Sequence, residues 1–204
     1  MQSGLTSVSA PLASAKGVGT SWGLSDTATM SSTDALTGLP DREAFLSEMS
    51  RLTRAGEPFS LLMLDLDNFK AVNVRAFPEQ ADRLLRRTGE AIVTVSPAGA
   101  MVFRYGGDEF AVVVATAATH EVVELGALLC AAVAAIEVPS SDDLHFPTPT
   151  HLACSIGAAC YPVDGPTADD LVLAAEMAQS QVKRAGGGQV AGANPPRDPP
   201  RTRL

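Results

Sequence analysis

Residues 104–110 constrain the fold of this chain more than any other segment. They read Arg-Tyr-Gly-Gly-Asp-Glu-Phe and lie between the apolar runs 101–103 and 110–114. Apolar runs that flank a glycine-rich break predict two strands joined by a tight turn. Gly106 and Gly107 lack a Cβ, which permits positive φ and lets the backbone approach a triphosphate. Asp108 adds a hard oxygen ligand suited to Mg²⁺. An ordinary Gly-Gly hairpin with an acidic rim is the alternative interpretation.

A second acidic cluster follows an apolar run at 59–64, which predicts a buried strand. Asp65 and Asp67 come directly after it. If the strand continues through these two residues, their carboxylates point to the same face of the sheet, and the Leu66 carbonyl lies between them. Lys70 lies within one helical turn and is placed to meet a phosphate. Asp67 has an alternative role as the N-cap of a short helix that starts near Asn68.

Length and charge restrict the class of protein. The chain has 204 residues, 46% of them hydrophobic, which is enough for one domain with tails. A net charge of -8 argues against nucleic-acid binding, because the phosphate backbone requires a basic face. No apolar run approaches the roughly 18 residues of a membrane span, and no signal peptide begins the chain. We therefore expect a cytoplasmic protein without membrane contact.

The three cysteines fit a reducing compartment. They are odd in number and show no Cys-x-x-Cys spacing. Cys154 and Cys160 fall on one predicted strand, about 20 Å apart, which is too far for a disulfide. We expect all three, Cys130 included, to be reduced core residues.

The remaining pattern predicts alternating helices and strands. Helices are expected from Asp41, over 84–95, over 121–136 and over 167–185, with a strand at 151–161 and a loop at 137–150. Residues 1–33 are expected to form a flexible leader, and 191–204 a disordered tail rich in Pro and Arg. This order predicts an α+β fold with a ferredoxin-like antiparallel sheet and flanking helices.

Four segments, 34–42, 64–70, 104–110 and 155–157, resemble in order and spacing the GGDEF family of diguanylate cyclases. The resemblance covers about residues 34–190. It implies the nucleotidyl cyclase and polymerase-palm architecture, in which the Asp65 strand end lies beside the Gly106-Gly107 turn. It also implies condensation of two GTP molecules into cyclic di-GMP, with release of pyrophosphate, by a homodimer with a possible protein partner.

The resemblance also implies a role for each site residue. Mg²⁺, with Mn²⁺ as an alternative, is expected to be held by Asp65, the Leu66 carbonyl and Asp108. Glu109 is expected to assist at the metal or at the ribose 3′-hydroxyl. Phosphates are expected to meet Lys70 and Lys183, and guanine to be read by Asn73 and Asp82. The alternative for Asn73 and Asp82 is that they are turn and helix-start residues.

Several positions depart from the family pattern. Val74, Phe77, Pro78 and Ala81 alter the wall between the guanine readers, Gly187 replaces an Arg that grips the terminal phosphates, and Ser180 replaces a Tyr. Pro97 and Ala100 stand where the family carries its product-inhibition Arg and Asp. A rival prediction is therefore a degenerate domain that binds GTP or a protein partner. A relative that accepts another nucleotide is a third.

Overall fold

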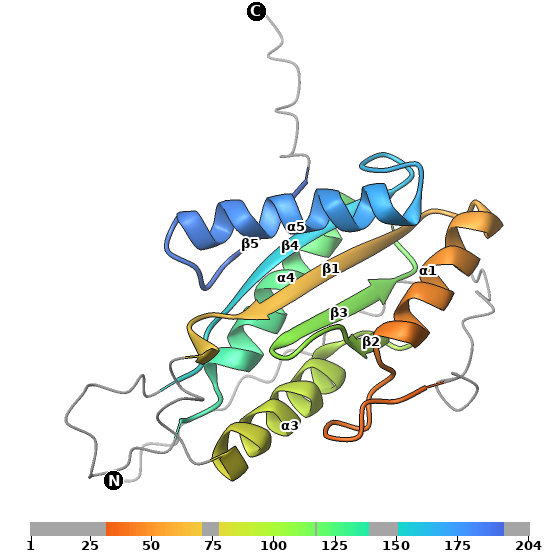
Figure 1. Ribbon diagram of the computed structural model, residues 1–204. Coiled ribbons are helices and arrows are strands. Elements are labelled where there is room, and N and C mark those ends of the chain that lie inside the picture. The colour runs from red at the N-terminus through yellow and green to blue at the C-terminus, as the bar shows by residue number, and fades with distance from the viewer. Residues whose placement is uncertain (1–31, 71–77, 117, 139–150, 194–204) are drawn as a thin grey trace, which may run out of the picture.

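The computed structural model describes residues 32–70, 78–116, 118–138 and 151–193 (Figure 1). The elements follow in the order α1 (Arg42–Ala55), β1 (Phe59–Leu66), α3 (Pro78–Val95), β2 (Met101–Arg104), β3 (Glu109–Val114), α4 (Thr119–Ala134), β4 (Cys154–Tyr161), α5 (Ala168–Arg184) and β5 (Val190–Gly192). Asn73 and the altered positions 74–77 lie outside the described residues, as do 1–31, 139–150 and 194–204.

The five strands form one sheet in the order β2-β3-β1-β4-β5. The first four pair antiparallel, which confirms the ferredoxin-like arrangement, whereas β5 pairs parallel with β4. The sheet is therefore mixed rather than wholly antiparallel. The predicted tail boundary at 191 is also wrong, because Val190–Gly192 form an edge strand.

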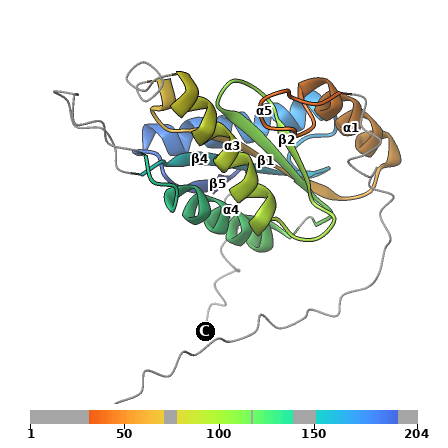
Figure 2. The ribbon, with the colours of Figure 1, turned by 90° about the horizontal axis from the view of Figure 1, so that it is seen from below.

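Helices cover both faces of the sheet (Figures 1 and 2). Leu62 and Leu64 of β1 belong to the core beneath α3 and α4, while Leu61 and Met63 belong to the core beneath α1 and α5. Successive side chains of a strand point to opposite faces, so a central strand covered on both sides needs an unbroken apolar run. This burial on both faces explains the apolar sequence of β1. Among the helices of the described residues, none is long and apolar enough to cross a membrane.

Side-chain caps set the starts of α1 and α5. The Asp41 carboxylate accepts hydrogen bonds from the backbone N–H groups of Glu43 and Ala44, and α1 begins there. The Thr167 hydroxyl accepts one from Asp170 N–H at the start of α5. Both caps confirm the predicted helix starts.

Two predicted boundaries need correction. Ser32 Oγ donates to Asp41 Oδ1 over 2.5 Å, and Thr33 bridges to Pro40, so the ordered chain includes residues expected in the leader. The strand predicted from 151 begins at Cys154.

Candidate active site

The β2–β3 connection spans residues 105–108, a longer turn than the tight one expected. The N–H groups of Tyr105 and Gly106 both donate to the Glu109 carbonyl, over 2.9 and 3.1 Å. Neither Gly106 nor Gly107 has positive φ. A Cβ at Gly106 would collide with the Glu109 carboxylate, whereas one at Gly107 would meet open space. Backbone handedness therefore does not require Gly106, and a side chain at this position would displace the carboxylate of Glu109.

Arg104 holds this turn in place. Its Nε donates to the Gly106 carbonyl over 3.1 Å and its Nη2 to the Gly107 carbonyl over 2.5 Å. Its Nη1 pairs with Asp34 Oδ1 over 2.9 Å, and the guanidinium is largely buried. Arg104 thus ties the turn to the segment before α1. The sequence pattern contained both residues but did not show that they pair.

The turn lies against the end of β1, as the resemblance implies. Asp65 and Glu109 are direct cross-strand partners, and Leu66 N–H donates to the Asp108 carbonyl over 3.2 Å. Because cross-strand partners share a face of the sheet, the carboxylates of Asp65 and Glu109 lie on the face that α5 covers. We call Asp65, Asp108 and Glu109 the acidic cluster.

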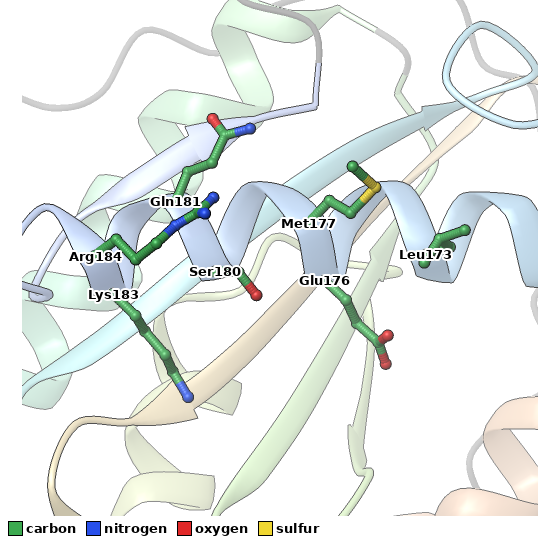
Figure 3. Close-up of a pocket in the computed structure, with 7 residues that line it drawn as sticks. All are labelled: Leu173, Glu176, Met177, Ser180, Gln181, Lys183 and Arg184. Carbon is green, nitrogen blue, oxygen red and sulfur yellow. The ribbon is translucent and has the colours of Figure 1, made fainter.

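Helix α5 supplies a cation to the acidic cluster. Lys183 Nζ lies 2.6 Å from Asp65 Oδ2. Figure 3 shows the Lys183 and Glu176 side chains leaving α5 toward β1. The expected phosphate ligand Lys183 is therefore at the site, paired with an expected metal ligand.

Charge is concentrated in the acidic cluster. Burial raises the pKa of Asp65, and Asp108 and Asp67 raise it further, against the lowering effect of Lys183. Burial also raises the pKa of Glu109, as do Asp65 and Asp108. Such mutual repulsion beside a strand end favours the binding of a cation.

The residues of the acidic cluster fit a divalent ion in donor type and charge. Carboxylate and carbonyl oxygens are the ligands that Mg²⁺ prefers. Among the described residues, however, no three Asp, Glu, His or Cys side chains stand close enough together to hold a metal ion. Because the ammonium group of Lys183 forms an ion pair with the Asp65 carboxylate, a metal ion bound by Asp65 would compete with that ammonium group.

Asp67 connects the end of β1 to two other elements. Its carboxylate accepts hydrogen bonds from Ser155 Oγ over 2.7 Å and from Gly188 N–H over 2.8 Å. Gly187 has φ of 77°, and a Cβ there would lie 2.7 Å from Asp67 Oδ2. The helix-cap hypothesis for Asp67 did not anticipate these partners.

The remaining predicted residues lie on α3, beyond β1 and along α5. Asp82 is half-buried near the start of α3, and Lys70 is exposed. Ser180 lines an open groove of about 520 Å³ along α5 with Leu173, Glu176, Met177, Gln181, Lys183 and Arg184 (Figure 3). Within the described chain, the structure thus brings Asp65, Leu66, Asp108, Glu109 and Lys183 together, and shows no bond from Asp82 or Lys70 to them.

The fold and the acidic strand ends define a domain with the nucleotidyl cyclase palm-like architecture. Residues 31–189 match the family described as diguanylate cyclase, GGDEF domain. The chain belongs to the GGDEF domain family.

Relatives agree with this membership. The chain is 30% identical to diguanylate cyclase DosC of Escherichia coli K12 over 164 residues, which are 77% of this chain and 34% of DosC. It is 31% identical to the cyclic di-GMP phosphodiesterase NbdA of Pseudomonas aeruginosa, over 75% of this chain and 19% of NbdA. The chain thus spans about a third or less of these curated relatives.

Solved structures share the fold. The GGDEF domain of TpbB (YfiN) from Pseudomonas aeruginosa has a TM-score of 0.70 and 29% identity, over 80% of this chain and 95% of that one. The diguanylate cyclase SiaD of Pseudomonas aeruginosa, solved in complex with its activator SiaC, has a TM-score of 0.69 and 25% identity, over 80% and 62% of the two chains.

Proposed function

We propose that this chain is a diguanylate cyclase that condenses two GTP molecules into cyclic di-GMP. The observation that carries the proposal is the acidic cluster with Lys183 beside it at the ends of β1 and β3. A structural ion pair would need one carboxylate. The chain instead holds three, and burial together with the charge of Asp108 raises the pKa of both Asp65 and Glu109, which is a cost that metal and phosphate binding explains.

Asp65, Asp108 and the Leu66 carbonyl are the proposed holders of Mg²⁺ or Mn²⁺. The ion, when bound, neutralises phosphate charge and activates the attacking oxygen. Lys183, released from Asp65, is then free to meet the terminal phosphates, and Lys70 is proposed to do the same. Guanine is proposed to be read by Asp82 together with Asn73.

Glu109 is proposed to accept the proton of the ribose 3′-hydroxyl. That oxygen forms a bond to the α-phosphorus of the second GTP, and the bond to pyrophosphate breaks. The raised pKa of Glu109 suits this role, because a base works best when its pKa lies near the working pH. Each ribose attacks the other nucleotide, so we propose a homodimer. The SiaD–SiaC complex supports a protein partner as well.

The test is to incubate the pure chain with Mg²⁺ and each nucleoside triphosphate and to identify products by mass spectrometry. We expect cyclic di-GMP from GTP alone. Asp108→Ala should abolish turnover with unchanged circular dichroism, and Glu124→Ala, an exposed acid on α4, should keep it. Equal activity in the parent and in Asp108→Ala would refute the site.

A GTP-binding module without turnover is the second candidate. Gly187 in place of a cation and the pairing of Lys183 with Asp65 favour it. Both candidates should bind GTP in a titration with Ca²⁺. They are separated by the product assay with Mg²⁺, in which the module forms no cyclic di-GMP.

A further inference from the structure

Two cysteines from distant parts of the chain lie next to each other. Cys130 on α4 and Cys154 at the start of β4 have sulfurs 3.9 Å apart, and the Cys130 thiol also contacts the Cys154 carbonyl over 3.5 Å. Both are free thiols. The spacing of the cysteines in the sequence did not reveal this pair, because Cys130 and Cys154 are far apart in the chain and meet only where α4 packs on β4.

Cys130 is accessible, whereas the other thiols are not. It is partly exposed, and it lines a groove of about 460 Å³ between α4 and the segment 188–190, while Cys154 and Cys160 are buried. Cys160 instead receives a hydrogen bond from Ser60 Oγ over 3.2 Å. Accessible thiols are the ones that small oxidants attack. The hydrogen bond with Cys154 also lowers the pKa of the Cys130 thiol, which favours the reactive thiolate.

We propose that Cys130 and Cys154 form a reversible disulfide when the protein meets a peroxide. The Cys130 thiolate attacks one peroxide oxygen, the O–O bond breaks, and the departing hydroxide takes up a proton to give water. Cys154 then attacks the resulting sulfenic sulfur, the S–O bond breaks, and a second water leaves. The two thiols lose two electrons and two protons, and the peroxide is reduced. A dithiol reductant reverses the step by thiol–disulfide exchange.

The geometry requires little movement. A disulfide needs its sulfurs about 2.05 Å apart, so roughly 2 Å must close, a distance within reach of side-chain rotation. Cys154 pairs with Leu66 across β1 and β4, so the bridge would form directly behind the acidic cluster. The proposal itself does not depend on cyclase activity.

The experiment treats the full chain with equimolar hydrogen peroxide, blocks remaining thiols with N-ethylmaleimide, and maps peptides by mass spectrometry. We expect a peptide joining Cys130 to Cys154, lighter by two hydrogens than its parts, with Cys160 alkylated. Dithiothreitol should restore all three thiols. Cys160→Ser should still form the bridge, and Cys130→Ser, which changes a partly exposed position, should not.

Three results would overturn the proposal. The first is full alkylation of Cys130 and Cys154 under conditions that oxidise glutathione. The second is sulfinic acid at Cys130 with Cys154 alkylated. The third is a disulfide found between two chains instead of within one. Peptide mapping requires no GTP turnover, so failure of the proposed function leaves this test intact.

Discussion

Substitution of Gly157 by alanine tests how α5 is held over the acidic cluster. Gly157 lies in the middle of β4, paired with Met63 on one side and Ala191 on the other. A Cβ there would overlap the Ala175 carbonyl and lie 2.5 Å from Gln179 N. Helix α5 therefore rests on bare backbone at this point, and an added methyl group must push it away.

The cost of Gly157→Ala has two sources. Overpacking costs about 1 to 3 kcal/mol. The displaced helix also loses the bonds from Gln179 Nε2 to the carbonyls of Met63 and Ser155, at 3.1 and 3.3 Å, each worth about 0.5 to 1.5 kcal/mol. We expect a loss of about 2 to 6 kcal/mol in the free energy of unfolding, which is a large share of the 5 to 15 kcal/mol typical of a domain.

Urea unfolding followed by circular dichroism measures this loss. Gly107→Ala is the matched control, since its Cβ meets open space, and we expect a change within about 0.5 kcal/mol. If Gly157→Ala unfolds at the same free energy as this control, α5 does not seat on β4 as described.

Three further outcomes follow from the site. Glu109→Gln should stabilise the domain at neutral pH by about 0.5 to 1 kcal/mol, because burial and then repulsion by Asp65 and Asp108 disfavour ionised Glu109, with solvent screening limiting the gain. The pKa of Glu109 is higher in the folded than in the unfolded protein, so the penalty is absent below the unfolded value of about 4.3 and grows as pH rises through the folded pKa. Urea unfolding should therefore show the gain in stability at pH 7 and not at pH 4. Arg104→Lys should lower the free energy of unfolding by about 1 to 3 kcal/mol, since lysine cannot bridge two carbonyls and Asp34 together, and an unchanged urea midpoint would contradict the clamp. Initial rates of cyclic di-GMP formation should stay flat as product is added, because Pro97 and Ala100 offer neither a guanidinium nor a carboxylate, and inhibition lost on changing that surface would refute this.

Local signals explain which elements the sequence predicted. The cap at Thr167, the helical periodicity and the glycines 186–188 mark both ends of α5, because each acts within one helical turn. The unbroken apolar run of β1 likewise records burial on both faces. These features identify the helices, the central strand and the acids at its end.

Long-range contacts escaped prediction for a physical reason. Strand β5 has three residues and pairs with β4 through backbone groups, so it leaves no pattern in side-chain type. The Lys183–Asp65 pair and the Cys130–Cys154 pair join positions that only the folded sheet brings together. Gly106 does not use the positive φ that glycine permits, and its closeness to the Glu109 carboxylate becomes visible only with the turn geometry.

Gly187, just after the end of α5, stands where the family carries an Arg that grips the terminal phosphates. Gly187→Arg tests whether the triphosphate site lacks this cation, but the test needs a suitable control. A side chain at residue 187 must adopt φ of 77° and crowd Asp67, so any substitution there costs stability, about 1 to 2 kcal/mol from handedness alone. Gly187→Ala carries this strain without the charge. The difference between the Arg and Ala variants therefore isolates the guanidinium.

We expect Gly187→Arg to bind GTP more tightly than Gly187→Ala by about 1.5 to 3 kcal/mol, the range for a hydrogen bond to a charged group. Isothermal titration with GTP and Ca²⁺ measures both, and added salt should narrow the difference. The parent chain is not a suitable reference for Gly187→Arg. The two proteins differ both in backbone strain at residue 187 and in charge, so a difference in their GTP affinity has two causes. Equal affinities in the two variants would mean that the end of α5 does not face the phosphates, and the proposed role of Lys183 on the same helix would fail with it.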